Sequence, residues 1–227
     1  MLAQVRGPWD PALDAMWELP LGHRALERGL EDVDQWLTDA APGRGRAGAI
    51  AAWVGGILAL VVVQRGVEQR QVLPLLKGRG QATPLEPFPE LYADLARREL
   101  VVHRYLRDWL ARPTPASAHP LREWLGDYRR CLKAYLSARE DVLLPLVALR
   151  LSAAEWAGVR RAIARATPQA HRSLALGLVL RGSTPEQAAS SLERLSGRER
   201  LFWYAIGRVR FRSTMDRLEG RGRGVRV

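Results

Sequence analysis

The sequence predicts an all-α protein in which residues 1–151 form an antiparallel up-down-up-down four-helix bundle and further helices follow. Apolar residues recur at steps of three and four, the spacing of one helix face, and little in the chain alternates as a strand does. Four such segments, each about 20 residues long, are separated by shorter stretches rich in Gly and Pro. Long helices with short connections pack as antiparallel neighbours, which favours the bundle.

The first two helices are predicted on either side of a Gly-rich linker. The first carries its apolar stripe over residues 19–37 and ends near the segment TDAAPGRGRAG. The second follows and runs to residue 75, before the loop segment KGRGQATPLEPFP. Its uncharged run AGAIAAWVGGILALVVV is shorter than the roughly 18–20 residues that cross a bilayer. We therefore expect a buried bundle helix here and no membrane span.

The third and fourth helices are predicted at residues 89–110 and 121–151, with the segment ARPTPASAHP as a break between them. Prolines lie inside the second and fourth helices, at Pro74 and Pro145. Each proline removes a backbone hydrogen bond and bends its helix. Similar sequences, VEQRQVLPLL and SAREDVLLPLV, surround the two prolines. The prolines therefore mark equivalent places in two helices.

Residues 152–216 are predicted to form a helical extension rather than an independent domain, because the helices are short and no linker precedes them. Helix starts are expected at the capping box SAAE, which begins at Ser152, and at the Thr-Pro pairs that begin at Thr167 and Thr184. The last helix, at residues 198–216, is expected to pack inward with Leu201, Phe202, Ala205, Ile206 and Val209. Residues 217–227 are basic, and we expect them to form a disordered tail.

The composition indicates an ordinary globular protein with an excess of arginine. The formal charge is +11, and arginines gather in residues 208–227. No aromatic residue interrupts them after Phe211 and no reading motif is present, so nucleic-acid binding is not expected. Cys131 is the only cysteine, which excludes an intrachain disulfide and a cysteine zinc site. Without a signal peptide at its start, the chain is expected in the cytoplasm. Nothing in it indicates an oligomeric state.

Polar side chains that are able to bind metals interrupt the apolar stripe in each of the four helices. Residues four apart lie on one helix face, so pairs at this spacing are expected to point to one spot in the bundle. A buried carboxylate without a partner costs several kcal/mol, which a metal, a salt bridge or a hydrogen-bonded network can offset. In chain order the residues are His23, Gln64, Glu68, Glu99, His103, Tyr135 and Glu140.

These features resemble the hemerythrin-like (HHE) proteins, in particular bacterial members with an added helical C-terminal section. In that family the second and fourth helices carry His-x-x-x-Glu-Glu, then an apolar pair and Pro, and QRGVEQRQVLPLL and YLSAREDVLLPLV are similar to this pattern. The first and third helices each supply histidine, matched by His23 in GHRALERGL and His103 in VVHRYLRDWL. The segments AAEWAGV and RERLFWYAIGRVRFRS are also similar to the extension, so the resemblance covers most of the chain from residue 19.

The resemblance implies a di-iron site in the bundle core, ligated mostly by histidine and bridged by two carboxylates. Such a site binds dioxygen or, in relatives, reacts with peroxide or nitric oxide. This chain departs from the pattern, because Gln64 and Tyr135 stand where the second and fourth helices should supply histidine. In members with two histidines on the third helix, Glu99 falls at the first of them.

The position of the fourth-helix carboxylate stays open. Alignment on the two prolines pairs Glu68 with Arg139 and Gln69 with Glu140. Either Arg139 or Glu140 therefore takes the carboxylate position of the fourth helix.

The first of three hypotheses for the core is an altered dimetal site. His23 and His103 would give nitrogen ligands, and Glu68, Glu99 and Glu140 would give oxygen ligands. Helix bundles with this mixture hold di-iron or di-manganese centres, and hard carboxylates favour such metals. The site would perform oxidative chemistry on a bound substrate.

The other two hypotheses need no metal. In the second, an enzyme or a small-molecule binding protein uses the vacated pocket, and a histidine acts as acid or base beside Glu99 or Glu68. In the third, a satisfied polar network holds together a structural or partner-binding bundle. Whether the protein is an enzyme is left open. The candidate catalytic residues are His23, His103, Glu99 and Tyr135, and Gln64 is expected in the pocket.

Overall fold

A computed structural model describes residues 18–38 and 43–220. All regular elements in these two ranges are helices, and no strand occurs in them, which confirms the prediction of an all-α protein. Most of the predicted tail, residues 221–227, lies outside the described ranges.

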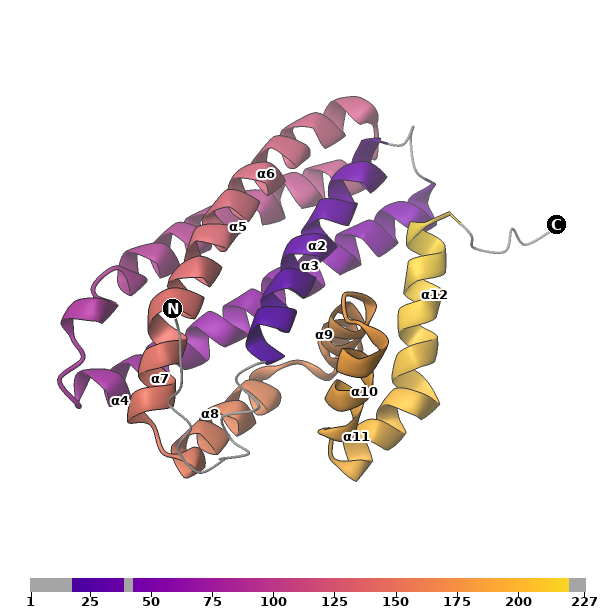
Figure 1. Ribbon diagram of the computed structural model, residues 1–227. Helices are drawn as coiled ribbons and strands as arrows, with labels where there is room; N and C mark the ends of the chain where they lie inside the picture. Colours follow the sequence, from indigo (N-terminus) through magenta and orange to yellow (C-terminus); the bar gives the residue numbers. More distant parts are fainter. Residues whose placement is uncertain (1–17, 39–42, 221–227) are drawn as a thin grey trace.

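Four long helices enclose one apolar core (Figure 1). They are α2 (Glu18–Thr38), α3 (Arg44–Val67), α5 (Phe88–Ala111) and α6 (Pro115–Ala138). Helix α2 packs against α3 and α6, and α5 also packs against α3 and α6, so each helix has two neighbours among the four. Leu30, Trp53, Leu95 and Leu132, one from each helix, are buried. The Trp53 indole N–H donates to the Gly29 carbonyl at 2.7 Å and so links α3 to α2.

Helix α6 begins six residues earlier than predicted, at Pro115 rather than residue 121. Thr114 caps it, because its hydroxyl accepts from the Ser117 N–H at 3.2 Å while the Ser117 hydroxyl accepts from the Thr114 N–H at 3.1 Å. A proline at the first helical position lacks only an N–H that would be unsatisfied anyway. The segment ARPTPASAHP therefore contains a helix start, and Pro120 lies inside α6.

The two repeated sequences form the same backbone structure. Helix α3 continues through the π-helical turn η1 (Glu68–Val72) into α4 (Leu73–Lys77), and α6 continues through η3 (Arg139–Leu143) into α7 (Leu144–Arg150). Each wide turn ends two residues before a proline, Pro74 or Pro145. A proline has no N–H to donate and clashes with the carbonyl four residues earlier, and a wider turn accommodates both effects. Glu68 and Arg139 open the two turns and are structurally equivalent.

Short helices make up the C-terminal section. They are α8 (Ala153–Ala166), α9 (Gln169–Arg181), α10 (Pro185–Glu193), α11 (Gly197–Phe202) and α12 (Arg208–Leu218), and the π-helical turn η4 (Trp203–Gly207) joins the last two. The short 3₁₀ helix η2 (Thr83–Leu85) precedes α5. The capping boxes at Ser152 and Thr184 confirm two predicted helix starts. Thr167 does not cap α9, because its hydroxyl donates back to the Ile163 carbonyl at 2.8 Å.

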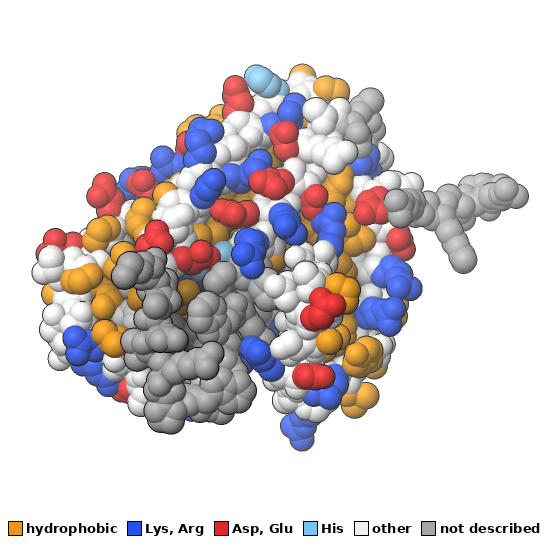
Figure 2. Space-filling view, viewed as in Figure 1, with side chains coloured by type: hydrophobic (Ala, Val, Ile, Leu, Met, Phe, Trp, Pro, Cys, Tyr) orange, Lys and Arg blue, Asp and Glu red, His pale blue; other side chains and the backbone are white. Residues whose placement is uncertain are grey.

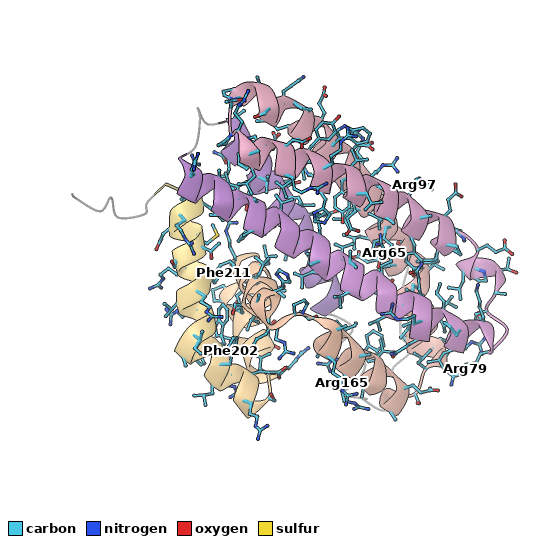
Figure 3. The ribbon with its side chains drawn as sticks, turned by 180° about the vertical axis from the view of Figure 1, so that it is seen from behind. Arg65, Arg79, Arg97, Arg165, Phe202 and Phe211 are labelled. Atoms are coloured by element: carbon cyan, nitrogen blue, oxygen red, sulfur yellow. The ribbon has the colours of Figure 1, made fainter. Side chains whose placement is uncertain are left out.

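The C-terminal section packs on α2 and α3 without a separate core. Helix α9 contacts both of them, and Trp156 and Leu178 belong to the same buried cluster as the residues of the four long helices. Gly177 of α9 permits close contact with α12, since a Cβ there would lie 2.1 Å from the Phe211 ring, which faces α9 (Figure 3). Helix α12 continues through Leu218, which is fully buried, so the basic tail begins later than residue 217.

The inward face of the last helix differs from the prediction. Leu201 and Val209 are 71% and 64% exposed, and Ile206 is also exposed, whereas Trp203 and Met215 are buried. For Val209 the reason is the wide turn η4, which inserts extra backbone and rotates all later residues around the helix axis; Leu201 lies before this turn, in α11. A regular 3.6-residue period read through this turn selects the wrong face.

Helix α3 and its continuation, Arg44–Lys77, form the single described helix that is long and apolar enough to cross a membrane. Half of its most apolar window is buried by other helices. This burial matches the expectation of a core helix and no membrane span.

Charges of both signs are interspersed on the outer face of the bundle (Figure 2). Two ion pairs join α6 to α2, Arg122 to Asp34 at 2.8 Å and Arg129 to Glu31 at 2.7 Å. Because the two arginines are partly exposed and the two carboxylates are exposed, each pair contributes about 1 kcal/mol or less.

Candidate functional site

A buried ion pair joins the two equivalent π-helical turns. The Arg139 Nε lies 2.5 Å from the Glu68 Oε1, and the two side chains are 2% and 3% exposed. The second carboxylate oxygen, Oε2, accepts hydrogen bonds from the Tyr135 hydroxyl at 2.7 Å and from the Tyr92 hydroxyl at 3.1 Å. The carboxylate thus has one charged and two neutral partners, which offsets the cost of its burial.

The electrostatics of this cluster fix the charges of its members. Burial, together with the negative charge of Glu68, raises the pKa of Tyr135 and of Tyr92 well above the usual value, so both phenols stay neutral donors. Burial is the largest single effect and would lower the pKa of Arg139, but the charge and hydrogen bond of Glu68 together with the neighbouring Tyr135 and Tyr92 outweigh it, so the net pKa is raised. Arg139 therefore keeps a full positive charge in the core.

His23 is held in one neutral tautomer. Its Nε2 contacts an Arg139 guanidinium nitrogen, which can only donate, and its Nδ1 lies 2.6 Å from the Glu140 Oε1. Nε2 is therefore the acceptor and Nδ1 carries the proton that is donated to Glu140. Burial first, then the charges of Arg139 and Arg24, lower the pKa of His23 to about 2. The side-chain carbonyl oxygen of Gln64, when it is turned towards the guanidinium, also accepts a hydrogen bond from Arg139. The distance from this oxygen to one terminal guanidinium nitrogen is 2.6 Å.

His103 and Glu99 belong to a different cluster. Glu99 pairs with Arg65 at 3.2 Å, and Arg65 also donates to the Tyr92 carbonyl at 3.3 Å (Figure 3). The His103 Nε2 lies 3.8 Å from Glu99, and the His103 side chain is 44% exposed. Burial raises the pKa of Glu99, and Arg65 and then His103 oppose that shift. The predicted site residues are thus divided between an Arg139 cluster and an Arg65 cluster.

The described structure does not bring the predicted ligand set together at one point. Within the two described ranges, no group of three or more His, Cys, Asp or Glu side chains is placed to hold a metal ion. The physical reason is the Arg139 guanidinium. It contacts His23 and pairs with Glu68, and it therefore occupies the place where the predicted ligands would hold a metal ion. Glu140, whose side chain is 40% exposed, lies outside the core and binds the outer nitrogen of His23. A dimetal centre does not fit these residues.

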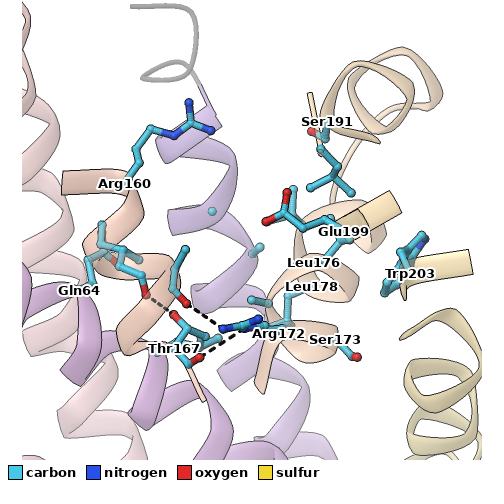
Figure 4. A pocket seen from close by; sticks show the side chains of 18 of the residues that line it. Gln64, Arg160, Thr167, Arg172, Ser173, Leu176, Leu178, Ser191, Glu199 and Trp203 are labelled. Atoms are coloured by element: carbon cyan, nitrogen blue, oxygen red, sulfur yellow. Dashed lines mark hydrogen bonds between the residues drawn. The ribbon is translucent and has the colours of Figure 1, made fainter. Parts of the chain in front are cut away.

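A cavity of about 790 Å³ lies between α2 and α3 on one side and the C-terminal section on the other (Figure 4). His23 and Gln64 line it from α2 and α3, and α8, α9, α10, α11 and Trp203 of η4 supply most of the remaining wall. Figure 4 shows Gln64 and Arg160 on one side of it and Ser191, Glu199 and Trp203 on the other. The apolar lining includes Leu26, Leu60, Ile163, Leu176, Leu178 and Phe202.

Two lining residues carry buried polar atoms without a hydrogen-bond partner in the described part of the chain. They are the Trp156 Nε1 and the Ser173 Oγ, and both side chains belong to residues that are 6% exposed. Unsatisfied buried donors are rare in proteins, and a bound ligand or water is a common explanation. Neither residue was predicted from the sequence, because both lie in the section that was expected to be a helical extension.

Comparison with known proteins adds no relative. No family model matches the chain, and neither a curated protein nor a solved structure matches it.

Proposed function

We propose that this protein binds a small, largely apolar molecule in the cavity between its long helices and its C-terminal section. The observation that carries the proposal is the cavity itself, with a volume of about 790 Å³ and mostly apolar walls. Ligand sites in proteins measure about 300–1,000 Å³ and combine apolar walls with a few polar groups. The Trp156 Nε1 and the Ser173 Oγ, which have no partner among the described residues, are such groups.

We further propose that α2, α3, α5 and α6 constitute a hemerythrin-like, antiparallel up-down-up-down bundle. The neighbour relations of these helices support this, as do the equivalent turns before Pro74 and Pro145. In this proposal the Arg139 guanidinium has replaced the metal of the family, and Glu68 has kept its carboxylate. The bundle then serves as a rigid wall of the binding cavity.

The geometry favours binding over acid–base catalysis. Both His23 nitrogens are engaged, and its low pKa keeps the ring neutral at ordinary pH. Tyr135 donates a hydrogen bond, but its acceptor is the ion-paired Glu68. His103 and Glu99 are absent from the described residues that line the cavity. A proton transfer in the core would therefore break a buried ion pair.

The test is titration with Nile red, an uncharged apolar dye, followed by its fluorescence. The wild-type chain should bind saturably, and Leu176→Trp, which fills the cavity, should weaken binding about tenfold or more. Leu149→Trp is the matched control, because Leu149 is 73% exposed and lies outside the cavity. Circular dichroism should show equal helicity in all three proteins. Equal binding by both variants, or no saturable binding by the wild type, would contradict the proposal.

A further inference from the structure

We infer that the ligand of this cavity is an amphipathic anion, an apolar chain or ring system that ends in a carboxylate or phosphate group. The inference rests on the proposed function, since it assumes that the cavity binds a small molecule. It adds the chemistry of the polar end, which the charged residues of the wall indicate.

The charged part of the described lining is strongly unbalanced. It comprises five arginines and one glutamate: Arg160, Arg161, Arg165, Arg172, Arg198 and Glu199. Four of the arginines, at positions 160, 161, 165 and 198, form no ion pair or hydrogen bond with another described residue. This contrasts with the outer face of the bundle, where Arg122 and Arg129 have carboxylate partners.

The fifth arginine and the glutamate have fixed positions. Arg172 donates to the Thr167 carbonyl at 3.4 Å and to the Ala164 carbonyl at 3.2 Å, so it is held at the C-terminal end of α8 (Figure 4). The Glu199 Oε2 accepts from the Ser196 N–H at 2.9 Å and from its hydroxyl at 2.7 Å. Glu199 thus caps α11, and its carboxylate does not pair with any of the five arginines.

An anion would compensate the positive charge of the cavity wall, which an uncharged ligand would not do. Unpaired like charges around a concave apolar surface create a positive potential that attracts anions. Trp156 and Arg160 are four residues apart on α8 and share a helix face, as do Arg161 and Arg165. The indole N–H of Trp156, which has no described partner, and the Arg160 guanidinium can therefore donate together to the oxygens of one head group. The apolar residues deeper in the wall take the rest of the ligand.

The experiment compares four ligands with the same chain by isothermal titration calorimetry, below the micelle concentrations of the three ionic ligands and below the solubility limit of the alcohol. These are dodecanoate, dodecyl phosphate, dodecanol and dodecylammonium. At least one of the two anions should bind about tenfold or more tightly than dodecanol, and dodecylammonium should bind most weakly. The order of the two anions identifies the head group as carboxylate or phosphate.

A pair of variants tests the residues. Arg160→Gln with Arg165→Gln should weaken the binding of the anion about tenfold and leave dodecanol unchanged. Arg97→Gln with Arg130→Gln is the control of equal charge, because these side chains are 67% and 75% exposed and lie outside the cavity. An equal loss in the control would overturn the inference by indicating general charge attraction. If dodecanol binds as tightly as both anions, the inference fails and the proposed function stands. If no ligand binds and Nile red does not bind either, the proposed function fails.

Discussion

Arg139 and Glu68 form an ion pair between two equivalent π-helical turns in the core, with 2.5 Å between the Arg139 Nε and the Glu68 Oε1. The guanidinium also contacts His23, so one cation organises the polar residues of three helical segments. A positive charge at this place solves the problem of a buried carboxylate without a metal. The consequences can be measured as stability, pH dependence and metal response.

Loss of the guanidinium should destabilise the protein strongly. Arg139→Met leaves the Glu68 carboxylate buried without its charged partner, which typically costs about 3–5 kcal/mol of the free energy of unfolding. Urea denaturation followed by circular dichroism measures it. Arg130→Met, at an exposed position, should change stability by less than about 0.5 kcal/mol.

A double-mutant cycle separates the ion pair from simple packing. Glu68→Gln keeps acceptors for the Tyr92 and Tyr135 hydroxyls but removes the charge. The variant with both Arg139→Met and Glu68→Gln should therefore be more stable than the sum of the single changes, by about 1–3 kcal/mol. Strict additivity would mean that the two charges do not interact and would remove the ion pair from the explanation.

The sequence predicted the equivalence of the two turns but not the residue that faces the core. Pro74 and Pro145 made the repeat visible, because a proline inside a helix has a defined backbone effect. The choice between Arg139 and Glu140 depends on a rotation of about 100° per residue, and the wide turn alters that rotation locally. A regular period therefore could not decide that Arg139 is buried and Glu140 exposed.

Sequence periodicity could not predict the cavity, for a different reason. Gln64 and Trp203 line the same space, although they are far apart in the chain and belong to α3 and η4. Periodicity shows which face of a helix is apolar, but it does not show which two faces leave a gap when they pack. Helix starts were predicted at Ser152, Thr167 and Thr184. Ser152 and Thr184 cap helices and Thr167 does not, whereas Thr114 caps α6 although no start was predicted there.

His23 should make stability depend on pH in a defined window. Its pKa is about 2 in the folded chain and 6.5 in an unfolded chain, where the ring is exposed to water, so the unfolded state binds the proton first. The contribution of His23 is fully present above pH 6.5 and is lost as pH falls from 6.5 towards 2, by about 1.4 kcal/mol per pH unit. The measurement is the free energy of unfolding from pH 8 to pH 4.

The variant His23→Gln isolates this contribution, because it accepts from Arg139 without titrating. Between about pH 6.5 and pH 4.5 the wild type should lose roughly 2–3 kcal/mol more than this variant. His119→Gln is the control, since the His119 side chain is 72% exposed and should follow the wild-type curve. Parallel curves for wild type and His23→Gln would show that the ring is not held neutral by its surroundings.

Metal binding should appear only when the guanidinium is removed and ligands are put in its place. In the variant with Arg139→Glu and Gln64→His, the new side chains join His23 and Glu68 around one centre. Without metal, two buried carboxylates face each other, so this variant should be less stable than the wild type. With Co²⁺ at about 100 times the dissociation constant, it should regain about 2.7 kcal/mol and a visible absorption band should develop.

The wild type should show neither response, because Arg139 already supplies the positive charge at that centre. An equal rise in the melting temperature of the wild type with Co²⁺ or Fe²⁺ would mean that the ion pair opens for metal, and the replacement of metal by Arg139 would then be wrong.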